Sequence, residues 1–141
     1  MRVEWAFFCT SATVDDLGQL TIFAPGVTKG YHEASEQPIS LKFIMCVESP
    51  YEEATSGVTK RVDARVYGPD MAIIKQFYYS LPLEVQNPEH YSEGWMGHSI
   101  LDCDLRLRAV ESGHYVLELQ SDTGEPVTVN YQVERYERTE G

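Results

Sequence analysis

The sequence predicts an all-β protein, a single antiparallel β-sandwich of the Ig-like or C2-like kind with about eight strands. Apolar and polar residues alternate with a period of two along several short segments, which is typical of half-buried strands. Turn-forming residues separate these segments at regular intervals. No segment has a sustained helical period, and only Glu33–Gln37 and Glu89–Trp95 could form a helical turn. These three observations together favour an antiparallel sandwich.

The region from Asp102 to Glu134 shows the alternation most clearly and predicts three consecutive strands in a meander. Glu111–Gly113 and Ser121–Pro126 supply the turns between these strands. The apolar side chains that alternate along them are Cys103, Leu105, Leu107, Ala109, Tyr115, Leu117, Leu119, Val127, Val129, Tyr131 and Val133. A meander with one apolar face must bury that face against a second layer, so we expect a second sheet.

Five strands are expected before this meander, over residues 2–10, 19–24, 39–48, 58–67 and 71–85. On the first of them, Val3, Trp5, Phe7 and Cys9 share one face. Phe8 makes the opposite face partly apolar, which indicates that this strand is covered on both sides.

Glycine and proline mark the ends of these strands. Val14–Gly18 predicts the first turn, and Gly68–Asp70 predicts a tight turn. Pro25–Gly26 ends or bulges the second strand, because neither residue suits the interior of a ladder. Pro82 indicates a bulge or an edge strand, because proline cannot donate to the ladder. Ser49–Gly57 is expected to be a polar loop.

Length and charge limit the classes of function. The 141 residues fit one domain, predicted over residues 1–134 and followed by a charged tail over 135–141. Eleven basic and 22 acidic residues give a net charge of −11. Such a field repels phosphate backbones and anionic membranes, so we expect neither nucleic acid nor membrane as a partner.

The N-terminal residues and the cysteines favour a cytoplasmic location. No secretory signal is recognisable, since Glu4 interrupts the apolar segment that such a signal needs. No apolar run reaches the roughly 20 residues of a membrane helix. Cys9, Cys46 and Cys103 are too few, and odd in number, for a disulfide framework. Each lies in an apolar, strand-like run, so we expect buried, reduced thiols.

Two regions carry a resemblance to a known family. Phe7–Val14 (FFCTSATV), Gly18–Phe23 (GQLTIF) and Gly26–Thr28 (GVT) resemble the N-terminal hairpin of a family of small bacterial proteins of unknown function. Ser112–Leu119 (SGHYVLEL) is similar to the penultimate strand of that family. These regions cover less than half of the chain, and Ala24–Gly26 departs from the family's usual small turn residue. The resemblance implies a single β-sandwich domain and implies no catalytic residue.

Catalytic and cofactor-binding motifs are not recognisable in the sequence. There is no Gly-x-Ser-x-Gly elbow for a nucleophile and no phosphate-binding glycine loop. The histidines and cysteines do not have the spacing of a zinc site, and His90 and His98 are interpreted as solvated loop residues. The sequence therefore predicts a protein that is not an enzyme and has no cofactor.

Acidic residues fall in alternate loops. If all strands are antiparallel, alternate connections meet at one end of a sandwich, which gathers carboxylates there. Ca²⁺ takes six to eight oxygen ligands, often from loops, so a weak calcium site is one hypothesis. Its candidate ligands are Asp15, Asp16, Glu52, Glu53 and Asp122. General acidity of polar loops is the alternative interpretation, because ligand spacing of the dedicated kind is missing.

The segment Asn87–Ser99 is expected to be a long loop without periodicity, and such loops are often functional. It displays side chains of types that are common in protein interfaces: His90, Tyr91, Trp95, Met96 and His98. Trp95 either forms part of an interaction surface or folds back to plug the sandwich.

The resulting hypothesis is a non-enzymatic module that binds a protein partner or associates with itself. The alternative is a sandwich that binds a small ligand, carbohydrate or Ca²⁺, or an enzyme that uses the 87–99 loop.

Overall fold

A computed structural model describes residues 1–17, 19–33, 37–82, 94–108 and 111–137, and it confirms the all-β class. These residues form ten strands and one helical turn, rather than about eight strands. The elements are β1 Arg2–Cys9, β2 Ser11–Val14, β3 Leu20–Phe23, β4 Lys29–Glu33, β5 Ile39–Pro50, α1 Tyr51–Ala54, β6 Thr59–Tyr67, β7 Ile73–Pro82, β8 Met96–Leu107, β9 Gly113–Gln120 and β10 Val127–Tyr136.

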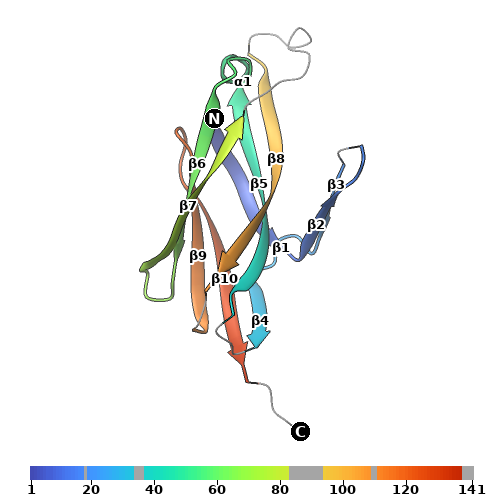
Figure 1. Ribbon diagram of the computed structural model, residues 1–141. Coiled ribbons are helices and arrows are strands. Elements are labelled where there is room, and N and C mark those ends of the chain that lie inside the picture. Colours follow the sequence, from blue (N-terminus) through green and yellow to red (C-terminus); the bar gives the residue numbers. More distant parts are fainter. Residues whose placement is uncertain (18, 34–36, 83–93, 109–110, 138–141) are drawn as a thin grey trace.

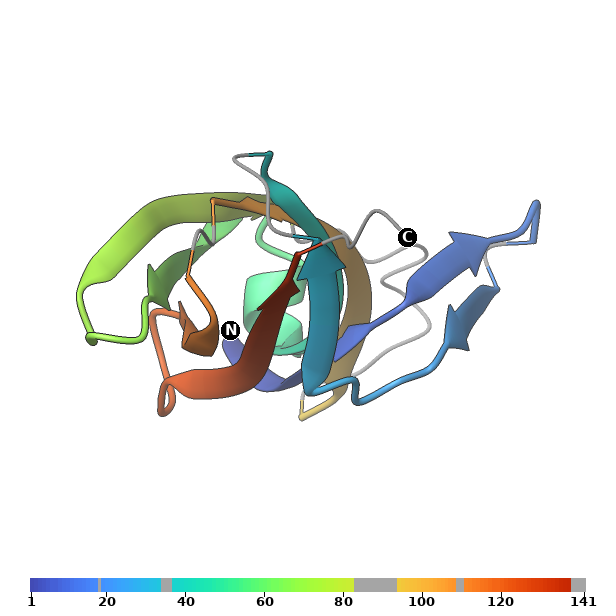
Figure 2. The ribbon, with the colours of Figure 1, turned by 90° about the horizontal axis from the view of Figure 1, so that it is seen from below.

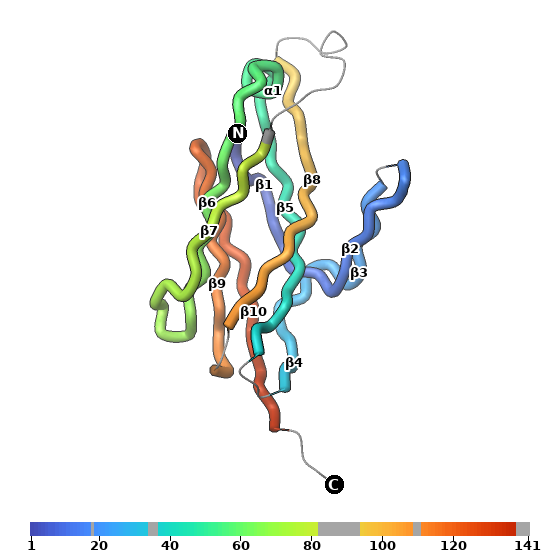
Figure 3. Tube along the Cα trace, in the orientation of Figure 1, coloured from blue at the N-terminus to red at the C-terminus, as the bar shows by residue number. Residues whose placement is uncertain are grey.

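The strands form three sheets. One has the order β1-β5-β8, the second has the order β4-β10-β9-β6-β7, and β2 and β3 form a separate hairpin (Figure 1). Figure 2 shows the two larger sheets on either side of the core, with the hairpin extending to one side. The chain begins near α1, and β10 ends at the opposite end of the molecule (Figure 3).

The core lies between the two larger sheets and takes apolar side chains from both. Phe43 of β5 is fully buried at its centre. The Phe8 ring packs edge-on against Phe43, with centroids 6.2 Å apart, and against Tyr131 of the facing sheet at 5.2 Å. The buried residues of this cluster are Met1, Val3, Phe8, Ile39, Phe43, Met45, Val47, Val62, Ala64, Val66, Cys103, Leu105, Leu107, Tyr115, Leu117, Leu119, Val129, Tyr131 and Val133.

Two edge strands of the facing sheets are linked by side chains. Lys75 Nζ on β7 donates to the Arg106 carbonyl on β8 at 2.6 Å. The Tyr79 hydroxyl on β7 donates to the Asp104 carbonyl at 3.4 Å. These side chains occupy two backbone acceptors on the open edge of β8, which limits unwanted pairing with other strands there. Pro82 ends β7, in agreement with the expected edge position.

The expected three-stranded meander is wrong in its first strand. β9 and β10 form the predicted antiparallel hairpin, but β8 pairs along its whole length with β5 in the other sheet. Alternation shows which side chains share a face and does not show which strand is the partner. The same limit explains β4, which pairs with β10 in parallel although all pairs were expected to be antiparallel.

The prediction that Val3, Trp5, Phe7 and Cys9 share one face was wrong, because β1 contains a β-bulge. Val3 pairs with Val47 and Trp5 pairs with Cys46, so Glu4 is an extra residue between them. The extra residue reverses the alternation, because it shifts every later side chain to the other face. Val3 and Phe8 therefore reach the core, and Trp5 is displayed on the outer face.

The first expected strand also divides at Thr10. β1 stays in the three-stranded sheet, and the chain then leaves it to form the β2–β3 hairpin. Backbone amides close the base of this hairpin: Thr10 donates to Phe23 at 3.0 Å, and Gly26 donates to Phe8 at 2.9 Å. Ala24 and Gly26 have positive φ angles of 50° and 78°, so the turn at Ala24–Gly26 redirects the chain toward β4.

The single helical turn lies inside the segment that was expected to be a polar loop. α1 follows Pro50 directly, at the end of β5. Residues 34–36 and 89–93 of the two segments with helical potential lie outside the described residues. At the other end of the chain, β10 continues to Tyr136, two residues beyond the predicted domain boundary. Within the described part of the chain, no helix combines the length and apolar character of a membrane span.

Replacing Phe43 by alanine is expected to lower the free energy of unfolding by about 3–5 kcal/mol, because it empties a fully buried aromatic site. Urea denaturation followed by tryptophan fluorescence measures this loss. Phe23→Ala is the control, since Phe23 lies on the hairpin and is 52% exposed. We expect less than about 1 kcal/mol there. Equal losses for the two variants would contradict the assignment of Phe43 to the core.

Candidate functional site

Part of the predicted interaction loop, residues 96–99, belongs to strand β8. His90 and Tyr91 lie outside the described residues. Met96 and His98 belong to β8, where they face Pro50 and Glu48 of β5, so the expectation of an irregular loop was wrong for them. Met96–Leu107 forms a strand because it pairs with the twelve-residue strand β5 along its whole length.

Trp95 lies just before β8 and is half-buried. Its carbonyl accepts a hydrogen bond from the Tyr51 amide at 3.0 Å, which ties it to α1. Its ring lies over the backbone of Gly97, where an added Cβ would come within 2.6 Å of the indole. Gly97 therefore makes room for the ring, and Trp95 is neither fully exposed nor a fully buried plug.

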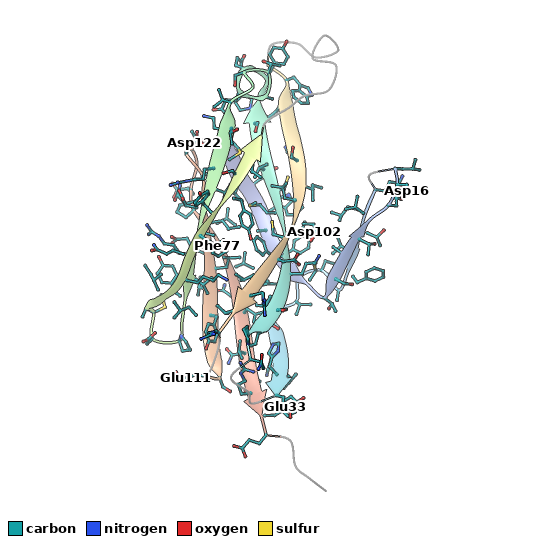
Figure 4. The ribbon with its side chains drawn as sticks, in the orientation of Figure 1. Asp16, Glu33, Phe77, Asp102, Glu111 and Asp122 are labelled. Carbon is teal, nitrogen blue, oxygen red and sulfur yellow. The ribbon has the colours of Figure 1, made fainter. Side chains whose placement is uncertain are left out.

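The predicted pole of acidic loops divides into two places. Asp15 and Asp16 lie at the tip of the β2–β3 hairpin, and Figure 4 shows Asp16 there, away from Asp122 on the body of the protein. Glu53 of α1 and Asp122 of the β9–β10 turn do come together. They flank Lys60, whose Nζ lies 3.1 Å from Asp122 and 3.9 Å from Glu53.

Two positively charged groups of the protein, Lys60 and the α-amino group of Met1, already neutralise the carboxylates of Glu53 and Asp122. The α-amino group of Met1 also pairs with Glu53, and it lies 3.7 Å from Asp122. Burial opposes ionisation of Asp122, but the hydrogen bond from Lys60 and the nearby positive charges leave its pKa below the usual value. Of the other calcium candidates, Glu52 lies in the same helical turn and is exposed. The arrangement is therefore an ion-pair cluster that joins α1, β6 and the β9–β10 turn.

A second polar cluster lies on the outer face of the β1-β5-β8 sheet. His98 Nε2 on β8 lies 3.2 Å from Glu4 Oε2 on β1, so the two side chains bridge over the central strand β5. Beneath this bridge, Cys46 Sγ donates to Glu4 Oε2 at 3.7 Å. Next to it, Glu48 is 8% exposed and accepts from Arg2 Nε at 2.7 Å. The cluster joins one imidazole, two carboxylates and one thiol.

Strand register explains why these side chains meet. Glu48 is paired with Arg2 on one side and with His98 on the other. Neighbouring strands lie about 4.8 Å apart, so long side chains from β1 and β8 can meet across β5. Glu4 is the bulged residue of β1, and a bulge typically re-aims a side chain. The sequence contains no local signal for this cluster, because its members are far apart along the chain.

The three thiols are free and buried, as expected. Burial raises the pKa of Cys46 to about 11, and the nearby charge of Glu4 adds to this effect. Burial likewise raises the pKa of Cys103 to about 12. Because the thiolate is the reactive form, all of these positions are poor nucleophiles at neutral pH.

The β2–β3 hairpin displays apolar side chains, with Leu17 at its tip. Leu17 is 84% exposed, the largest value among the exposed large apolar residues of the described chain. The Asp15 carboxylate holds the turn, since its Oδ1 accepts from the amides of Leu17 at 2.9 Å and Gln19 at 2.8 Å. Val14 and Phe23 on the same hairpin are also more than half exposed. Asp15 thus has a structural role here, as the acceptor that closes the turn.

A shallow groove of about 410 Å³ lies on the outer face of the five-stranded sheet. Arg61 stacks over the Tyr78 ring, 4.8 Å from its centroid, and pairs with Asp63 at 3.0 Å. Arg65 and Glu118 also line the groove. Four of its nine lining residues are charged, two of each sign, and Arg61 and Asp63 pair with each other.

Comparison with models of known protein families finds no match for this chain, and comparison with curated proteins finds none either. The resemblance to a family of small bacterial proteins therefore stays a prediction. The function is inferred from the geometry of the described residues.

The variant Asp122→Asn is expected to make stability less dependent on pH in acid. The pKa of Asp122 is lowered in the folded state, so its ionised form stabilises the fold above the ordinary carboxyl pKa. This contribution is lost as the pH falls through the lowered value. Wild type should therefore lose more free energy of unfolding than the variant between about pH 5 and pH 2. Urea denaturation at several pH values measures this.

Asp16→Asn is the matched control for this effect, because Asp16 lies on the hairpin away from Lys60 and Met1. Its pH dependence should follow wild type. If the free energy of unfolding depends on pH in the same way for wild type and Asp122→Asn, the assigned role of Asp122 is contradicted.

Labelling of the native protein by a maleimide at neutral pH should be slow at Cys9, Cys46 and Cys103, because all three are buried and their pKa values are raised. Mass spectrometry at timed intervals measures the modification, and the urea-unfolded chain provides the reference rate. Rapid modification of all three native thiols would show that they are accessible.

Proposed function

We propose that this protein is a non-enzymatic binding module that uses the β2–β3 hairpin to contact a protein partner. The observation that carries this proposal is Leu17, a large apolar side chain that is 84% exposed and whose amide donates to the Asp15 carboxylate. Single exposed apolar residues are ordinary on protein surfaces. Here, however, Leu17 at the tip and Val14 and Phe23 on opposite faces of the hairpin are all exposed, so this small element presents apolar side chains on both of its faces. A protein partner that wraps around the hairpin would cover them.

The isolation of the hairpin supports an interaction role. Among the strands of the described residues, β2 and β3 pair only with each other. A two-stranded hairpin is marginally stable by itself in water. A partner that covers its apolar side chains, or that adds a strand to its open edge, would stabilise it.

Charge favours a partner with basic residues around an apolar centre. The protein carries a net charge of −11, and Asp16 lies next to Leu17 at the hairpin tip. Complementary charge steers association and selects among partners. Two copies of this chain would repel each other at long range, so the proposed partner is a different protein rather than a second copy.

The residues near the start of β8 give weaker support for an interaction surface at the 87–99 segment, which the sequence predicted. Met96 is exposed, and Trp95 is half-buried. These two residues lie beside α1, and the hairpin projects from the other end of β1. We therefore assign the primary contact to the hairpin.

A small polar ligand is the second candidate function. The groove that contains Arg65 and Tyr78 on the five-stranded sheet favours it, because an aromatic face beside charged donors suits a carbohydrate or an anion. Arg61 already pairs with Asp63 and stacks on the Tyr78 ring, which leaves less of the groove for a ligand and makes this the weaker candidate.

The proposal also includes an Ig-like or C2-like sandwich as the body, with the hairpin and β4 added to it. Two facing sheets with a shared core support this description. Three free cysteines support a cytoplasmic location, where thiols are kept reduced.

Leu17→Asp combined with Phe23→Asp should weaken partner binding at least tenfold, because a charge would enter each apolar contact. The purified chain is used to capture partners, and each captured protein is then purified and titrated calorimetrically with wild type and variant. Binding should weaken with added salt if the partner is basic.

Val58→Asp is the matched control, since Val58 is exposed but lies away from the hairpin, between α1 and β6. It should bind like wild type. Equal binding by the hairpin variant would contradict the proposal. Analytical ultracentrifugation of the chain alone tests the choice of partner, and a dimer lost on Leu17→Asp would show that the occupant is a second copy.

A further inference from the structure

Three side chains that commonly ligate metals converge on the outer face of the β1-β5-β8 sheet. They are Glu4 of β1, Glu48 of β5 and His98 of β8, and one ligand atom from each lies within 4.8 Å of the others. We propose that these three residues bind a divalent transition-metal ion, with Zn²⁺ the best fit. This site is separate from the hairpin surface and does not depend on its function.

The kinds of donor indicate the class of metal. One imidazole nitrogen and two carboxylates form a mixed nitrogen and oxygen set, which suits zinc and its neighbours in the first transition row. Ca²⁺ needs six to eight oxygen ligands, and Mg²⁺ prefers oxygen ligands and water, so neither matches a three-residue site that includes histidine.

The geometry of two of the ligands already fits. His98 Nε2 and Glu4 Oε2 are 3.2 Å apart. In a tetrahedral zinc site with bonds of about 2.0–2.1 Å, two ligand atoms are about 3.3 Å apart. The side chains of His98 and Glu4 are 49% and 38% exposed, so both have room to adjust their rotamers around an ion.

Glu48 supplies the third ligand from a more constrained position. Its side chain is largely buried, Arg2 Nε donates to its Oε2 at 2.7 Å, and Arg2 Nη2 forms an ion pair with the same oxygen at 2.7 Å. A carboxylate has about four lone-pair sites, so it can accept from Arg2 and also ligate a metal. Hydrogen bonds of this type orient metal-binding carboxylates in known sites. Arg2 is therefore a positioning residue for Glu48.

Together the three protein ligands leave one tetrahedral position for water, as in many zinc sites that are not closed. Cys46 lies beneath Glu4, and its sulfur is 3.7 Å from the Glu4 carboxylate. We place Cys46 outside the ligand set, because its buried sulfur does not belong to the group of converging ligand atoms that Glu4, Glu48 and His98 form.

The proposal is tested by calorimetric titration of the tag-free, full chain with ZnCl₂ in a non-chelating buffer. We expect one saturable site per chain, which excess CaCl₂ or MgCl₂ does not displace. His98→Gln and Glu4→Gln should each lower the zinc affinity at least tenfold, because each removes a direct ligand. At the same zinc concentration, the melting temperature of wild type should rise more than that of His98→Gln.

His114→Gln is the matched control, because His114 is exposed on β9 of the five-stranded sheet and bonds to Asn130 of the neighbouring strand β10. It should bind zinc like wild type. Cys46→Ser should change the affinity by less than about threefold if the thiol is not a ligand. Circular dichroism verifies that each variant is folded. Absence of saturable binding, a loss of affinity on His114→Gln, or wild-type affinity in both ligand variants would overturn the proposal.

Discussion

Strand β5 is covered on both of its faces, and the arrangement of the other elements depends on this coverage. Its odd-numbered residues enter the core between the two large sheets. On the outer face, Ile44 and Cys46 are buried as well, although no second layer of strands among the described residues lies over them. Trp5, Phe7 and Ile100 flank them on the neighbouring strands. A three-stranded sheet would otherwise leave such apolar side chains in water.

The bulge at Glu4 makes this outer cover possible. Without an extra residue, Trp5 would point toward the core and Ala6 toward the outside. With it, the rings of Trp5 and Phe7 stack in parallel on the outer face, 5.4 Å apart. The same bulge directs Glu4 toward His98, so one irregularity in β1 determines both the apolar cover and the polar cluster beside it.

The sequence predicts local features of this fold well and distant pairings poorly. The β9–β10 hairpin follows from alternation and a turn, and the buried thiols follow from their apolar neighbours. The partner of β8 and the parallel pairing of β4 depend on contacts between distant segments, which periodicity does not encode. For the site, His98 was singled out with His90, but the residues that it meets are Glu4 and Glu48. The register of β1 and β8 against β5 brings Glu4, Glu48 and His98 together. The spacing of these residues along the sequence does not indicate that they meet.

The parallel pair of β4 and β10 has a consequence for synthesis of the chain. Lys29 of β4 pairs with Gln132, about 100 residues later. At about 5–20 residues per second, the ribosome makes β10 roughly 5–20 s after β4. During this interval β4 has neither its neighbour nor a complete sheet to join. Lys29 and Glu33 are charged residues at its two ends, and charged side chains on an unpaired strand hinder pairing with other nascent chains. The charged ends of β4 therefore protect it from pairing with other chains until β10 has been synthesised.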